Sequence, residues 1–165
     1  MVDRGNPSAR VLIIGEAPGR NEDLEGRAFV GRGGRLLDRL MKKEGFDTER
    51  DCLIVNVVKC RPPDNRRPRP EEVEACSPYL KKQIALTDPK IILLLGAVAL
   101  RRMMPEKRAF SMKEETGRFF EHDSFPGVRF MVLYHPAFIL RDSRKEPLMT
   151  EHIRRFKKSW EAFRV

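Results

Sequence analysis

Short runs of apolar residues alternate along this chain with segments whose apolar residues recur at helical spacing. Four runs have the length of buried strands, residues 11–14, 52–55, 91–95 and 130–133. Runs that are apolar at every position, and that are bounded by glycine or polar residues, are typical of strands in a parallel sheet covered on both faces. The pattern therefore predicts four central strands.

Helical periodicity follows each of these strands. Apolar residues at helical spacing predict a helix that ends near Gly45, a helix that begins at Pro70, a helix over residues 97–104 and a last helix near the C-terminus. Residues 105–127 are weakly patterned, with at most an irregular strand around 117–120. The alternation of strand and helix predicts an α/β fold, a three-layer α/β/α sandwich with a central, mainly parallel four-stranded sheet, as a single domain over residues 1–165.

Composition narrows the classes of partner. The chain has 33 Lys and Arg residues against 24 Asp and Glu, a formal net charge of +9, which favours an anionic partner, either nucleic acid or a membrane surface. Its most apolar run, residues 91–100, is far shorter than the roughly 20 residues of a membrane-spanning helix. The first ten residues lack an apolar signal core. We therefore expect a cytoplasmic monomer with no membrane contact and no obligate protein partner.

The segments that follow the four strands carry the candidate chemistry. They are residues 15–34, 56–69, 96–97 and 135–141. In a parallel sheet the carboxyl ends of the strands share one edge, so these segments can converge on one pocket. The first segment is rich in glycine but lacks the G-x-G-x-x-G spacing of dinucleotide-binding folds, which disfavours a flavodoxin-like binder of small molecules.

Two polar side chains stand directly after strands. The amide of Asn56 can read a polar edge such as the O4 and N3–H groups of a pyrimidine. The alternative is a turn-forming Asn that bonds nearby backbone. A neutral His135 can donate a hydrogen bond to a leaving oxygen, and the alternative is a structural histidine beside the turn at Pro136.

The glycine-rich segment adds carboxylates and one aromatic ring. Glu16 or Glu22 can position water or stabilise a cationic sugar, and the alternative for each is solvation or helix capping. Phe29 can stack on a flat base, and the alternative is packing under the loop. No lysine nucleophile is evident at the predicted pocket.

Residues 138–141 form an apolar run that ends in a cation. Phe138, Ile139 and Leu140 can act as a wedge that fills the gap left by an extruded nucleotide, while Arg141 holds a phosphate. The alternative is an ordinary helix start or a buried turn.

Together these residues resemble the uracil-DNA glycosylase superfamily, most closely its family 4 of bacteria and archaea. The matching pieces are GEAPGRNEDLEGRAFVGRGGRLLD, NVVKCRPPDNRRPRPEEVEAC, LLGAVAL and HPAFILR, in the family's order. The resemblance implies that the protein flips uracil out of DNA and hydrolyses its N-glycosidic bond. With no lysine nucleophile evident, we expect an abasic site without strand cleavage.

The resemblance also implies roles for single residues. Glu16, Glu22 and His135 would be catalytic, and the base would be bound by Gly15, Ala17, Pro18, Gly19, Phe29, Asn56 and His135. DNA would contact Arg66, Arg67, Gly96, Phe138, Ile139, Leu140 and Arg141. Ala17 stands where family 1 places an Asp, so leaving-group stabilisation would carry more of the rate.

Family 4 enzymes carry a [4Fe-4S] cluster on four cysteines, two of them in an N-terminal CxxC. Cys60 and Cys76 match the other half of that site, but the chain has three cysteines and no CxxC. We therefore expect no cluster, no other cofactor and no metal.

Two alternatives to this function stay open. One is a non-catalytic DNA- or nucleotide-binding relative with the same fold, which keeps the pocket but does not turn over. The other is a glycosylase that acts on another deaminated base.

Overall fold

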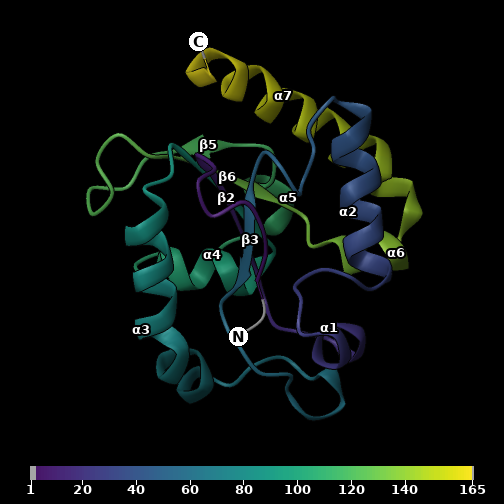
Figure 1. Ribbon diagram of the computed structural model, residues 1–165, viewed down its shortest axis with the longest axis vertical. Helices are drawn as coiled ribbons and strands as arrows, with labels where there is room; N and C mark the ends of the chain where they lie inside the picture. Colours follow the sequence, from purple (N-terminus) through teal and green to yellow (C-terminus); the bar gives the residue numbers. More distant parts are fainter. Residues whose placement is uncertain (1–2, 165) are drawn as a thin grey trace.

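The structure, a computed structural model, describes residues 3–164 and has a central sheet with helices on both faces (Figure 1). The predicted strands are present as β2 (Val11–Gly15), β3 (Leu53–Asn56), β4 (Ile91–Leu95) and β6 (Arg129–Leu133). They pair in parallel in the order β3-β2-β4-β6. The predicted parallel core of the sheet is confirmed.

The prediction of four strands is wrong in number, because the sheet has six strands within residues 3–164. β1 (Arg4–Gly5) pairs antiparallel with β3 at one edge, and β5 (Phe119–Phe120) pairs antiparallel with β6 at the other. A strand of two residues is too short to show a period of two, so sequence pattern could not reveal β1. β5 lies where an irregular strand was expected.

Side chains that alternate along the strands form two cores, one on each face of the sheet. On one face Ile13 and Leu93 pack with α2 (Arg32–Lys43) and α7 (Glu146–Arg164). On the other face Leu12 and Leu94 pack with α3 (Pro70–Thr87) and α4 (Ala97–Met103). Figure 1 shows these two pairs of helices on opposite sides of the sheet. The predicted three-layer arrangement is thereby confirmed.

Short helical segments connect these elements. They are α1 (Arg20–Glu25), η1 (Pro63–Asn65), α5 (Met112–Glu115), α6 (Pro136–Arg141) and η2 (Ser143–Lys145). The glycine-rich segment 15–34 is therefore not a continuous irregular loop, since it contains α1 and the start of α2. Nowhere in residues 3–164 is a helix both long enough and apolar enough to cross a membrane.

Candidate active site

A pocket of about 900 Å³ lies at the carboxyl ends of the parallel strands. Its walls come from all four segments that follow those strands, including Ala17, Pro18 and Gly19 from the first and Gly96 from the third. Parallel strands bring these segments to one edge of the sheet. The predicted convergence on one pocket is confirmed.

Asn56 forms part of the pocket wall at the end of β3. Its residue is 1% exposed, yet neither its side-chain oxygen nor its nitrogen has a hydrogen-bond partner among the described residues. Leaving a buried amide without partners costs about 1–3 kcal/mol for each unpaired group. A buried donor and acceptor that are both unused, and that border a cavity, indicate a site for a ligand with the complementary pair.

The Phe29 ring lies beside Asn56 and packs over Gly15. A Cβ built on Gly15 would lie 2.4 Å from Phe29 Cζ and 2.6 Å from Asn56 Oδ1, so only glycine allows this approach. The ring centroid of Phe29 is 5.8 Å from that of His135. The structure thus brings Gly15, Phe29, Asn56 and His135 together, as the sequence predicted.

Phe29 has a left-handed backbone, with φ at 56°. This conformation costs a residue with a Cβ about 1 kcal/mol or more, so contacts around the loop must hold it. Gly34 permits one of these contacts, since a Cβ there would lie 1.7 Å from the Phe29 carbonyl oxygen. Helix α2 can therefore begin directly against the loop.

Glu22 holds the same loop through its carboxylate. Its Oε1 accepts a hydrogen bond from the Gly19 N–H at 3.0 Å, and its Oε2 accepts from Val30 at 2.8 Å and Gly31 at 2.5 Å. Both oxygens are engaged with backbone donors. The geometry therefore favours loop shaping over water activation as the role of Glu22.

Glu16 is the other carboxylate of the pocket wall and is half-buried. Burial raises the pKa of Glu16 above its usual range, and the positive charges of Arg67 and Arg141 partly offset that rise. A carboxylate beside a cavity and near two cations can orient water or face developing positive charge.

His135 caps the N-terminus of α6, and its Nδ1 accepts a hydrogen bond from the Ala137 N–H at 3.1 Å. Burial lowers the pKa of His135 to about 4; Arg141 lowers it further and Glu22 opposes the change. The imidazole is therefore neutral at pH 7. Since Nδ1 is an acceptor, the ring proton is on Nε2, which leaves Nε2–H as a hydrogen-bond donor.

Basic side chains surround the pocket. The predicted residues Arg66, Arg67 and Arg141 line it, and Arg66 also forms an ion pair with Glu72 at 2.7 Å. Sequence reasoning missed four more cations in the wall: Arg20, Arg32, Lys113 and Lys145. The two arginines lie within the glycine-rich segment and could have been found there. The two lysines come from short segments without a pattern. That no lysine acts as a nucleophile at the pocket stays a prediction.

The predicted wedge is the helix α6. Phe138 lines the pocket, and its ring stacks on Tyr134 with centroids 4.7 Å apart. Leu140 is 40% exposed, whereas Ile139 is 1% exposed and packs in the core. In this conformation the side chain of Ile139 is not available for contact with DNA, because α6 packs against α2 and Ile139 lies in the core on that face of the sheet.

The cysteines do not fit a four-thiolate cluster. Cys52 is fully buried, its Sγ donates to the Thr48 carbonyl, and burial raises the pKa of its thiol. Cys60 is exposed and Cys76 is half-buried. Among the described residues no three His, Cys, Asp or Glu side chains are grouped to hold a metal ion. The absence of a cluster stays a prediction, and no step below depends on one.

Known proteins resemble the chain over almost its whole length. A sequence model described as the uracil DNA glycosylase superfamily matches residues 2–164. A type-4 uracil-DNA glycosylase of Thermotoga maritima is 40% identical over 146 residues, which are 88% of this chain and 74% of that protein. One from Saccharolobus solfataricus is 39% identical over 162 residues, 94% of this chain and 73% of that protein. A type-5 enzyme of Pyrobaculum aerophilum is 31% identical over 147 residues, 81% of this chain and 63% of that protein.

Proposed function

The chain belongs to the uracil DNA glycosylase superfamily, and from that premise we propose that it removes uracil from DNA by hydrolysing the N-glycosidic bond. The observation that carries this proposal is the buried, unpartnered amide of Asn56 beside the Phe29 ring. Uracil has a flat ring with an N3–H donor next to an O4 acceptor. The Asn56 oxygen can accept from N3–H while its nitrogen donates to O4, and Phe29 can stack on the ring.

Cations around the pocket supply the interaction with DNA. Arg67, Arg141 and the lysines of the wall can neutralise phosphates on either side of a flipped nucleotide. Extrusion of the base costs a few kcal/mol of stacking and pairing, which these contacts and the filled pocket offset. The exposed Leu140 on α6 can occupy the space that the base leaves.

Cleavage of the bond requires that the base leave as an anion. The C1′–N1 electron pair passes to uracil, where negative charge develops on O2. The Nε2–H of neutral His135 can donate to that oxygen, and a neutral donor needs no proton uptake at pH 7. Water then adds to C1′ of the cationic sugar and loses a proton.

Glu16 is our proposed partner of the sugar and of the attacking water. It lies in the pocket wall, whereas both oxygens of Glu22 bind backbone N–H groups. A carboxylate there stabilises the cationic sugar and can accept a hydrogen bond from water. The product is an abasic site, and we assign Lys113 and Lys145 to phosphate contact.

A uracil-release assay on single- and double-stranded oligonucleotides tests the proposal. We expect the wild-type protein to release free uracil and leave intact abasic DNA, and Asn56→Ala to slow release by at least about 100-fold, because the base loses both of its hydrogen bonds. Asn6→Ala makes the same change at a half-buried asparagine outside the pocket, whose side chain bonds the backbone of Ser8 and Arg50, and it should keep the wild-type rate.

Other outcomes separate the alternatives. Binding of DNA without uracil release at high enzyme would indicate a non-catalytic relative. Faster release of another deaminated base would indicate a different substrate. Strand cleavage at the product site would overturn the assignment of the two lysines.

A further inference from the structure

Arg4 is a buried cation in the edge strand β1, outside every motif of the pocket. The residue is 5% exposed. Burial alone would lower the pKa of Arg4, but hydrogen bonds to Asp38 and Glu49 outweigh it and raise the pKa above its ordinary value. The guanidinium is therefore a buried positive charge, and the groups that it binds must explain why it is there.

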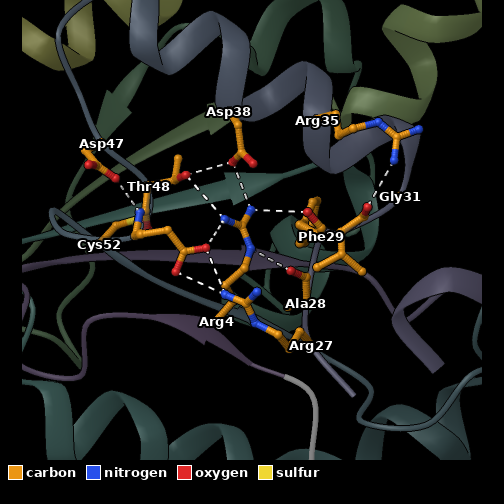
Figure 2. Close-up of polar contacts among 12 residues, drawn as sticks. Arg4, Arg27, Ala28, Phe29, Gly31, Arg35, Asp38, Asp47, Thr48 and Cys52 are labelled. Carbon is orange, nitrogen blue, oxygen red and sulfur yellow. Dashed lines mark hydrogen bonds and ion pairs between the residues drawn. The ribbon is translucent and has the colours of Figure 1, made fainter. Parts of the chain in front are cut away.

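All five N–H groups of the guanidinium have acceptors (Figure 2). Nη1 donates to Glu49 at 2.8 Å and to Thr48 at 3.4 Å, and Nη2 donates to Asp38 at 2.8 Å. These three contacts hold the planar group in one orientation. The side chains of Asp38 and Glu49 are 39% and 52% exposed, so water can reach both residues without Arg4.

The two remaining donors point at the backbone of the loop that carries Phe29. Nε donates to the Ala28 carbonyl at 2.8 Å, and Nη2 also donates to the Phe29 carbonyl at 3.2 Å. The neighbouring Asp3 carbonyl accepts from the Ala28 N–H at 3.3 Å. Figure 2 shows the guanidinium between helix α2 and these two carbonyls. Arg4 and its neighbour Asp3 thus hold residues 28 and 29 by contacts to the backbone groups of these two residues.

The contact of Arg4 with the loop lies at a residue whose backbone conformation is energetically unfavourable. Phe29 has φ at 56°, a conformation that residues with a Cβ rarely adopt. From the other side, Glu22 accepts hydrogen bonds from the Val30 and Gly31 N–H groups. The loop is therefore held between a cation on its carbonyl groups and an anion on its N–H groups. Lysine could not replace the cation fully, because it has three donors and no planar fork.

We propose that Arg4 is a positioning residue that holds the Phe29 ring in place to stack on the flipped base. It lies outside the pocket wall, and it acts through the carbonyl groups of Ala28 and Phe29. This inference rests on the proposed function, in which Phe29 stacks on uracil. It adds a residue that no pocket motif contains.

A double-mutant cycle between Arg4 and Phe29 tests the inference. The rate of single-turnover uracil release is measured for wild type, Arg4→Met, Phe29→Ala and the double variant, with affinity for undamaged DNA measured beside it. Loss of base stacking should slow Phe29→Ala by about 5- to 150-fold. Arg4→Met should slow release by about tenfold, because a displaced ring no longer fits the base. In the Phe29→Ala background, Arg4→Met should slow uracil release by less than about twofold.

Two further variants separate positioning from general destabilisation. Arg129→Met removes another partly buried guanidinium, which donates to Ser159 outside the pocket, and it should keep the release rate while lowering the thermal midpoint. Arg4→Lys should fold and keep the positive charge, and its rate of uracil release should lie between those of wild type and Arg4→Met. Affinity for undamaged DNA should not change in either Arg4 variant.

The inference is overturned if the Arg4 and Phe29 effects multiply, or if Arg4→Met and Arg4→Lys release uracil as fast as Arg129→Met. If Arg4→Met does not fold, the same cycle with Arg4→Lys decides. A wild-type protein that releases no uracil would overturn the proposed function itself. If only the Arg4 inference fails, the wild-type protein still releases uracil and Asn56→Ala still slows that release.

Discussion

Gly15→Ala adds one methyl group directly beneath the proposed base site. The new Cβ would lie 2.4 Å from Phe29 Cζ and 2.6 Å from Asn56 Oδ1. Carbon atoms in contact are separated by about 3.5–4.0 Å, so the ring must move by about 1 Å or more. Overpacking of this kind costs about 1–3 kcal/mol of folding stability. The Asn56 amide must shift as well.

The expected loss of activity follows from that displacement. A misplacement of about 1 Å in a group that positions the substrate can lower the rate about 100-fold. We expect single-turnover uracil release by Gly15→Ala to fall by that factor, with near-normal affinity for undamaged DNA, because the basic wall of the pocket is unchanged. Circular dichroism and a thermal melt would establish that the variant is folded.

Gly127→Ala is the matched control. Gly127 lies outside the pocket wall and a Cβ there would meet no atom within 4 Å, but its φ of 79° makes alanine about 1–2 kcal/mol less favourable than glycine. This variant should keep the wild-type rate while its thermal midpoint falls, so lost stability alone would not explain a slow Gly15→Ala protein. A folded Gly15→Ala protein with a wild-type rate would refute the assignment of the space between Phe29 and Asn56 to the base.

Two more predictions concern the charges of the pocket. Glu22→Gln replaces a carboxylate that accepts three backbone N–H bonds, including that of Gly31, with an amide that has one acceptor oxygen. Denaturant unfolding should show a free energy of unfolding lower by about 2–4 kcal/mol. Unchanged stability would contradict the loop-shaping role. Arg141→Met removes a charge that lowers the pKa of both Glu16 and His135, so both pKa values should rise. Each group then protonates at a higher pH, and the acid limb of the kcat/KM profile should move upward; an unmoved limb between pH 4 and 7 would refute this coupling.

The sequence predicted most of the sheet and the polar residues that end its strands. Runs such as residues 91–95 are apolar at every position, which is typical of a strand covered on both faces. Parallel pairing then places Asn56 and His135 at the same edge, so the pocket follows from local pattern and one topological rule. The resemblance to one family added the base and the reaction.

The residues that hold the pocket in shape were beyond sequence reasoning. Neither β1 nor Lys145 lies in a segment with a period, so nothing along the chain connects them with the site. The engagement of Glu22 with three N–H groups depends on the path of the loop between α1 and α2. The burial of Ile139 depends on how α6 packs against α2.

Residue types and their order were therefore enough to predict the chemistry of the glycine-rich segment, because an apolar strand, a dense set of glycines and one aromatic ring are local facts. Tertiary structure decided the rest: which carboxylate binds backbone N–H groups, how Phe29 is kept in a left-handed backbone conformation, and why Arg4 is buried. The physical reason is that these contacts join residues far apart in the chain, such as Arg4 and Asp38, and each depends on distances that only the folded chain defines.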